Sequence, residues 1–213
     1  MPEAFDLLET LQWTPARGFF LIDRHLSRMM ESARHFGYAY DAGGLRAALE
    51  RAVRAAGAPQ RVRLLLSRDG AIRVERADLR AVAMSRVVLA QAPVDRADAS
   101  LYHKTTNRAL YDEAKRPFPA GAVDDVILWN TDGQVTESTI ANVVVEIDGR
   151  KVTPPVHCGL LGGTFRAQLL EDGAIHEGII TVDQLRARRR LWLINSVREW
   201  WPAELDDATS PRQ

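Results

Sequence analysis

The chain has 213 residues, of which 46% are hydrophobic and 26% are charged, which is the composition of a globular protein with one domain or two small ones. Its 28 basic and 28 acidic side chains balance, so the positive excess that marks nucleic-acid-binding proteins is missing. The single cysteine, Cys158, excludes an internal disulfide and a metal site built from several cysteines, and we expect no metal site.

Signals for membranes and export are also missing from the sequence. No apolar run approaches the roughly 20 residues that a helix needs to cross a bilayer. Residues 1–4 lack the basic and apolar regions of a signal peptide. We therefore expect a cytoplasmic protein that does not bind membranes.

The first half of the chain predicts a small α/β domain over residues 1–95. Apolar residues at intervals of three and four predict an amphipathic helix, with Asp23 as its N-cap and Gly37 as its end. The pair Asp69-Gly70 predicts a hairpin turn. The predicted elements are a strand (5–13), two helices (25–36 and 41–56) and two strands (61–67 and 72–75).

The second half, residues 96–213, predicts a larger β-rich domain, and we expect an α+β fold for the whole chain. The end of the chain, residues 206–213, is polar and is expected to be frayed. The predicted elements from residue 87 onward are strands (87–94, 126–129, a return strand that starts at Val135, 142–147 and 191–194), a strand or strand end (179–182) and helices (109–116, 165–171 and 182–189).

Lys104 lies between a predicted strand and a predicted helix, in the stretch His103-Lys104-Thr105-Thr106. Most lysines are surface charges, and this stretch alone leaves that interpretation open. The alternative is a buried amine with a depressed pKa, which can act as a nucleophile toward carbonyl groups.

Three features suggest a site for an anion such as a phosphate group. A glycine-containing loop that includes Gly163 and Thr164 leads into a helix, and helix N-termini favour anions. Asn195 and Ser196 follow a buried strand and offer amide and hydroxyl donors. Arg28 lies within the amphipathic helix and offers a guanidinium. Each feature also fits an ordinary turn or a surface arginine.

Glu137 lies in Thr136-Glu137-Ser138-Thr139, where neighbouring hydroxyls and the amide of Asn142 suit a carboxylate held by hydrogen bonds. Pyridoxal phosphate would use all of these parts. Its aldehyde reacts with a lysine amine, its phosphate requires an anion site, and its pyridine nitrogen requires a carboxylate partner.

The chain resembles the fold-type IV pyridoxal-phosphate enzymes, which include branched-chain and D-amino-acid aminotransferases and aminodeoxychorismate lyases. The resemblance covers nearly the whole chain and is closest to the lyase-like branch, often found as the C-terminal part of fused para-aminobenzoate synthases. The motifs that carry it are Phe5-Asp6-Leu7-Leu8-Glu9-Thr10, His25-Leu26-Ser27-Arg28, His103-Lys104-Thr105-Thr106-Asn107-Arg108, Thr136-Glu137-Ser138-Thr139, Gly159-Leu160-Leu161-Gly162-Gly163-Thr164 and Asn195-Ser196-Val197-Arg198.

The resemblance implies a role for each candidate residue. Lys104 would be the Schiff-base lysine, and Glu137 would pair with the pyridine nitrogen. The phosphate would be bound by Arg28, Gly163, Thr164, Asn195 and Ser196. The resemblance also implies a homodimer, with the cofactor between a small N-terminal α/β domain and a larger β-rich C-terminal domain.

The resemblance further implies an enzyme of folate biosynthesis that acts on a small amino substrate and converts 4-amino-4-deoxychorismate to 4-aminobenzoate and pyruvate. It also implies a synthase component as a candidate partner. Two alternatives are an aminotransferase for a D- or branched-chain amino acid, and a non-catalytic partner domain of a chorismate-processing synthase. Branched-chain aminotransferases carry a tyrosine shortly after the lysine, whereas Tyr111 is displaced here, which favours the lyase branch. Arg61 or Arg63 is a candidate for binding a substrate carboxylate.

Overall fold

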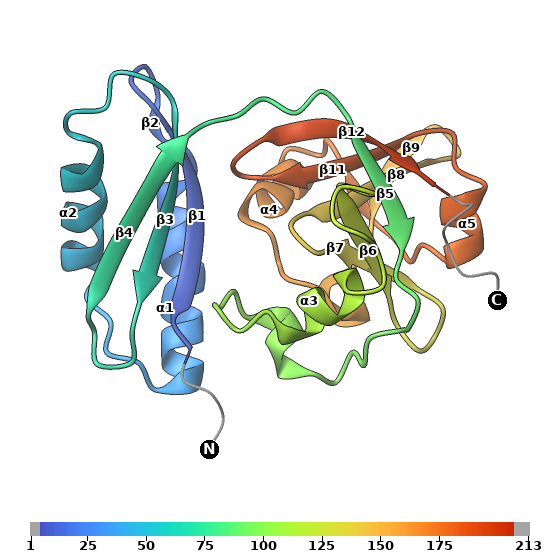
Figure 1. Ribbon diagram of the computed structural model, residues 1–213, viewed down its shortest axis with the longest axis horizontal. Coiled ribbons are helices and arrows are strands. Elements are labelled where there is room, and N and C mark those ends of the chain that lie inside the picture. Colours follow the sequence, from blue (N-terminus) through green and yellow to red (C-terminus); the bar gives the residue numbers. More distant parts are fainter. Residues whose placement is uncertain (1–4, 207–213) are drawn as a thin grey trace. The chain divides into compact units, whose positions relative to one another are not determined.

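The computed structural model describes residues 5–206, which form two units (Figure 1). Unit 1 holds residues 5–81 and His103–Asn107, and unit 2 holds Val82–Tyr102 and residues 108–206. The expectations for residues 1–4 and for the tail beyond residue 206 lie outside the described residues.

Unit 1 is an antiparallel sheet of strand order β2-β1-β3-β4 with two helices on one face. Alternate residues of β1, Leu7 and Leu11, belong to one apolar core with Leu26 of α1 and Leu45 of α2, which places both helices on the same face. The elements are β1 (Leu7–Thr14), β2 (Gly18–Phe19), α1 (Ile22–Phe36), α2 (Ala42–Val53), β3 (Gln60–Leu66) and β4 (Ile72–Asp78).

Helix α1 begins earlier than its apolar period predicts. The cap position is Leu21, in the left-handed region with φ of 55°, so the prediction that Asp23 is the N-cap is wrong. Asp23 lies in the first turn, where a carboxylate suits the positive end of the helix dipole, and pairs with Arg46 at 2.5 Å. Gly37 is confirmed as the end of the helix, with φ of 71°.

The segment His103–Asn107 belongs to unit 1 because it pairs with the start of β1. Leu7 and Thr105 form an antiparallel bridge, the amide of Leu8 donates to the carbonyl of Lys104 at 2.9 Å, and the amide of Thr106 donates to Asp6 at 2.9 Å. The structural division therefore differs from the predicted boundary at residue 95. The chain enters unit 2 at Val82 and returns briefly to unit 1 around Lys104.

Unit 2 is built around a sheet that closes on itself, because β7 pairs with both β6 and β8. The strands are β5 (Ser85–Leu89), β6 (Asp125–Trp129), β7 (Val135–Ser138), β8 (Asn142–Ile147), β9 (Arg150–Thr153), β10 (His176–Glu177), β11 (Leu191–Asn195) and β12 (Glu199–Leu205). The helices are η1 (Ala99–Tyr102), α3 (Ala109–Lys115), η2 (Val156–Cys158), α4 (Thr164–Glu171) and α5 (Val182–Arg186).

Strand β5 of unit 2 is covered on both faces. Val87 and Leu89 belong to one core cluster, which also holds Trp201, whereas Val88 belongs to a second cluster with Leu101. A strand that is buried on both faces has a continuous apolar run, as the sequence has at residues 87–90. The predicted α+β fold, with a small N-terminal unit and a larger β-rich unit, is confirmed.

Within residues 5–206, no helix has the length and apolar character needed to cross a membrane. The same residues contain no group of three or more His, Cys, Asp or Glu side chains that could bind a metal ion.

Candidate active site

Lys104 is held in unit 1 through the backbone of its own segment. Its pairing with β1 places Lys104 opposite Leu8. The preceding residue, His103, packs on α1, where its Nδ1 lies 3.0 Å from the hydroxyl of Ser32 and its ring stacks on His35 with centroids 4.4 Å apart. These contacts on both sides fix the position of the backbone that carries the lysine.

Arg28 is fixed in the same unit by a buried carboxylate. Its Nε donates to Oε1 of Glu9 at 2.8 Å, and an Nη atom donates to Oε2 at 2.6 Å. His25 contacts the same carboxylate through Nδ1 at 2.6 Å. Glu9 and His25 are 1% and 0% exposed. The backbone of Leu8 binds Lys104, so adjacent residues of β1 hold the lysine segment and the guanidinium.

The charges of this cluster are set by its neighbours. Burial raises the pKa of Glu9, but the charge of Arg28 and the contact with His25 outweigh that effect and lower it to about 2. Burial lowers the pKa of His25, with a further lowering from the charges of Arg28 and Lys104, against the opposing effect of Glu9. At neutral pH the cluster therefore holds an anionic Glu9, a neutral His25 and a cationic Arg28.

Glu137 lies in unit 2, on β7, with 4% of its surface exposed. The hydroxyl of Tyr111, on α3, donates to its Oε1 at 2.8 Å. Burial and the neighbouring charge of Glu137 raise the pKa of Tyr111, so the phenol keeps its proton. The hydroxyl of Ser138, one of the expected neighbours, instead closes the turn to Ala141.

The predicted phosphate loop lies against β8. Gly163 is at the cap position of α4, and Thr164 is the first residue of that helix and 5% exposed. The side chain of Asn142 donates to the carbonyl of Leu161 at 2.9 Å, and a Cβ on Gly163 would lie 1.9 Å from Oδ1 of Asn142. The close approach of Asn142 therefore requires glycine at position 163, and Asn142 pairs with Glu137 across the sheet.

Asn195 and Ser196 form the second predicted turn of the phosphate site. Oδ1 of Asn195 accepts from the amides of Val197 and Arg198, each at 2.9 Å, and Nδ2 donates to Ile140 at 3.2 Å. The Asn195 side chain thus shapes the turn and ties it to the β7–β8 connection, while Ser196 is 6% exposed. In unit 2, Asn142 contacts both the strand of Glu137 and the loop of Gly163 and Thr164. The turn of Asn195 and Ser196 is hydrogen-bonded to the β7–β8 connection through Ile140.

Arg61 and Arg63 lie on the face of the unit 1 sheet that the helices do not cover, opposite Gln12 and Thr10 of β1. The pairing with β1 places Lys104 on the same face, because its partner Leu8 alternates with Leu7. Arg63 pairs with Glu75 at 2.8 Å, whereas Arg61 is exposed.

Sequence reasoning did not single out Glu9, His25 or the contact of Tyr111 with Glu137. A signal for Glu9 was present, because Leu7, Glu9 and Leu11 alternate along a strand, so the carboxylate must share the apolar face. The approach of Tyr111 to Glu137 joins residues 26 positions apart and has no periodic signal.

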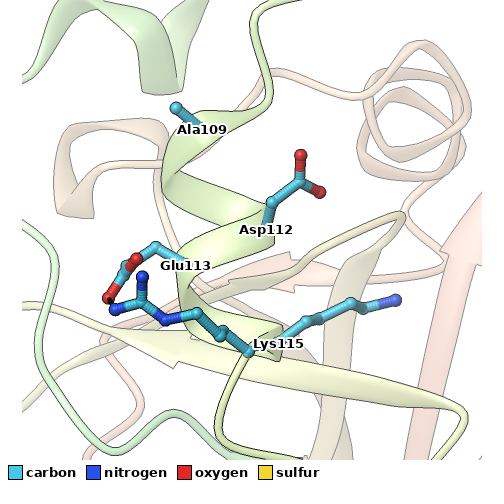
Figure 2. Close-up of a pocket in the computed structure, with 5 residues that line it drawn as sticks. Ala109, Asp112, Glu113 and Lys115 are labelled. Carbon is cyan, nitrogen blue, oxygen red and sulfur yellow. Dashed lines mark hydrogen bonds and ion pairs between the residues drawn. The ribbon is translucent and has the colours of Figure 1, made fainter. Parts of the chain in front are cut away.

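A shallow hollow on α3 does not contain the predicted residues. It is lined by Ala109, Asp112, Glu113, Lys115 and Arg116, and Figure 2 shows Glu113 on the opposite side of the helix from Lys115. Glu113 pairs with Arg116, and Lys115 lies 3.3 Å from Asp125. Glu113, Arg116 and Lys115 thus have charged partners, so we do not assign the site to this hollow.

The family model described as "Amino-transferase class IV" matches residues 6–205. The chain belongs to the class IV aminotransferase family. Over 193 residues it is 36% identical to a Schizosaccharomyces pombe protein named "Putative aminodeoxychorismate lyase", covering 84% of this chain and 81% of that relative. The fold-type IV prediction is thereby confirmed, and the family depends on pyridoxal phosphate.

Solved structures of class IV enzymes agree with this fold. A "Putative amino-acid aminotransferase" from Mesorhizobium loti is 35% identical with a TM-score of 0.90, covering 95% of this chain and 100% of that chain. A hypothetical aminotransferase from Mycobacterium tuberculosis, in a PLP-bound form, is 25% identical with a TM-score of 0.79, covering 98% and 84%. The relatives of this chain thus include both lyase and aminotransferase names.

Proposed function

We propose that this chain binds pyridoxal 5'-phosphate through Lys104, with Glu137 at the pyridine nitrogen. Arg28, Gly163, Thr164, Asn195 and Ser196 would hold the phosphate, with Asn195 shaping the turn that presents Ser196. The residues fit such a group. Gly163 leaves no side chain at the start of α4, Glu137 is a buried carboxylate that accepts from the phenol of Tyr111, and Arg28 has a guanidinium held by Glu9.

The cofactor assignment is tested by the spectrum of the purified protein. After incubation with pyridoxal phosphate we expect an absorbance band at roughly 410–430 nm that disappears on borohydride reduction. Reduction should also leave the cofactor covalently attached to the peptide that contains Lys104, as read by mass spectrometry. A protein that stays colourless, or a Lys104→Ala variant that keeps the band, would contradict the assignment.

We propose that the reaction is the conversion of 4-amino-4-deoxychorismate to 4-aminobenzoate and pyruvate. The observation that carries this proposal is the 36% identity to the Schizosaccharomyces pombe relative over 84% of this chain. The displaced position of Tyr111 also supports it, because branched-chain aminotransferases carry a tyrosine shortly after the lysine. The elimination balances by itself, since the atoms of the substrate are divided between the two products without an oxidant, a reductant or a second keto acid.

The bound cofactor would supply an aldehyde that condenses with amines and a ring that accepts electron density. Lys104 would remove the proton from the amino-bearing carbon of the substrate and deliver a proton as pyruvate leaves. Glu137 would keep a proton on the pyridine nitrogen, and the donor from Tyr111 holds that carboxylate in place.

The alternative is an aminotransferase, which the Mesorhizobium loti relative favours by its 35% identity over 95% of this chain. Product analysis separates the two reactions. The lyase releases pyruvate from aminodeoxychorismate with no added keto acid, whereas an aminotransferase requires one and transfers the amino group to it. Amino transfer to 2-oxoglutarate without pyruvate release would reject the lyase proposal. A non-catalytic partner domain is disfavoured, because Lys104, Glu137 and the Gly163 loop are all present.

Arg61 is our candidate for the substrate carboxylate. It lies on the same sheet face as Lys104, and Arg63 is already paired with Glu75. A homodimer, a cytoplasmic location and a synthase component as partner stay predictions from the sequence, and the mass of the protein in solution tests the first of them.

A further inference from the structure

Unit 1 contains a buried ion pair between Glu9 and Arg28, and apolar packing alone does not require a charge at this position. Glu9 is 1% exposed and lies between Leu7 and Leu11 on the face of β1 that packs against α1. A carboxylate in such a position must be paired, and a buried pair is often no more stabilising than apolar residues of similar volume. The placement of this charge therefore suggests a role other than stability.

The geometry of the pair fixes the plane of the Arg28 guanidinium. A guanidinium has five N–H donors in one rigid plane. Glu9 accepts from Nε at 2.8 Å and from an Nη atom at 2.6 Å, so that both carboxylate oxygens are used along one edge of the fork. The other three N–H groups of Arg28 lie in the same plane. Because Glu9 fixes the orientation of that plane, it also fixes the directions in which these three groups point.

A third residue holds the carboxylate itself. His25 lies one helical turn before Arg28 on α1, and its Nδ1 is 2.6 Å from Oε2 of Glu9. His25 is 0% exposed, so this contact is closed to solvent. The side chain of Arg28 is 14% exposed, whereas those of Glu9 and His25 are 1% exposed, so Arg28 is the member of the cluster nearest to solvent.

We propose that Glu9 is a positioning residue for Arg28, and that it sets the affinity of the protein for the phosphate group of its cofactor. This inference rests on the proposed function, in which Arg28 binds that phosphate. A flexible arginine loses rotamer freedom when it binds an anion, and this loss weakens binding. A guanidinium that Glu9 already holds has lost this freedom before the anion binds, so binding costs less entropy. Because the charge of Glu9 offsets that of Arg28, the advantage lies in oriented donors rather than in net charge.

The test compares pyridoxal phosphate with pyridoxal, which has the same aldehyde and ring but no phosphate. Equilibrium affinities for both are measured by tryptophan fluorescence in the wild-type protein and in Glu9→Gln. We expect Glu9→Gln to weaken binding of pyridoxal phosphate by about tenfold or more, and that of pyridoxal by less than about twofold. In an Arg28→Lys background, Glu9→Gln should change the ratio of the two affinities no further.

Asp23→Asn is the matched control, because Asp23 lies on α1 as Arg28 does, and the variant removes an exposed ion pair between Asp23 and Arg46 of α2. It should leave both affinities unchanged. An equal loss of affinity for both ligands in Glu9→Gln would overturn the inference, because that result means general damage to unit 1. A wild-type protein that binds neither ligand would instead reject the proposed function.

Glu9→Asp keeps the charge on a shorter side chain and carries the test if Glu9→Gln does not fold. A selective loss of affinity for pyridoxal phosphate, smaller than the loss in Arg28→Lys, supports the inference. An unchanged ratio of the two affinities overturns it.

Discussion

The hydroxyl of Tyr111 donates a hydrogen bond of 2.8 Å to Oε1 of Glu137, which joins α3 to β7 at a carboxylate that is 4% exposed. Tyr111 is itself held from its other side, because the guanidinium of Arg108 lies 4.6 Å above its ring. Arg108 in turn donates to the carbonyl of Thr139 at 2.5 Å. The phenol therefore has little freedom to leave the carboxylate.

Replacing Tyr111 with phenylalanine should destabilise the protein by about 1.5–3 kcal/mol, because it removes a donor to a buried charged acceptor. The measurement is a urea unfolding curve of the variant and the wild type. Tyr102→Phe is the control, since the hydroxyl of Tyr102 donates to the neutral carbonyl of Arg96 at an exposed position. Tyr102→Phe should lower the free energy of unfolding by less than about 1 kcal/mol. Equal losses in the two variants would contradict the importance of the contact with Glu137.

The Gly163→Ala variant should disturb the loop before α4. The added Cβ would lie 1.9 Å from Oδ1 of Asn142, so either Asn142 or the loop must move, at a cost of about 1–3 kcal/mol. Gly162→Ala is the control in the same loop, because its Cβ would meet Val156 at 3.8 Å, an ordinary contact. Thermal unfolding of both variants is the measurement. A Gly163→Ala protein as stable as Gly162→Ala would show that Asn142 can give way freely.

Stability should fall as the pH is lowered, first through His25 and then through Glu9. Burial lowers the pKa of His25 in the native state, so below its unfolded value of 6.5 the unfolded state binds more protons. Burial raises the pKa of Glu9 but Arg28 and His25 lower it to about 2, so its contribution is present above 4.5 and is lost between about 4.5 and 2.

The contribution of Glu9 amounts to about 3 kcal/mol at most. Urea midpoints at several pH values between 7 and 3 are the measurement, and Glu9→Gln should give a shallower decline below pH 4.5 than the wild type. Parallel curves for the two proteins would show that another group controls acid unfolding.

The sequence predicted those features of the fold and of the candidate site that depend on local residue patterns and on motifs. The apolar period of α1 and the left-handed Gly37 are local properties, and they were confirmed. The cap at Leu21 was missed because it has a left-handed backbone without a glycine. The return of Lys104 to unit 1 was missed because it depends on backbone pairing with Leu8, nearly a hundred residues earlier, and no side-chain pattern encodes such a pairing.

Arg61 provides a kinetic test of the substrate-binding face. If it binds the substrate carboxylate, Arg61→Gln should raise the KM for aminodeoxychorismate by about tenfold or more and change kcat little, since this contact is equally present before and during the reaction. Arg76→Gln is the control, because Arg76 is an exposed arginine of β4 whose partner Val62 alternates with Arg61, so it lies on the other face of the sheet. Its KM should match that of the wild type. A KM that rises equally in both variants would mean that Arg61 acts only through the overall charge of the sheet.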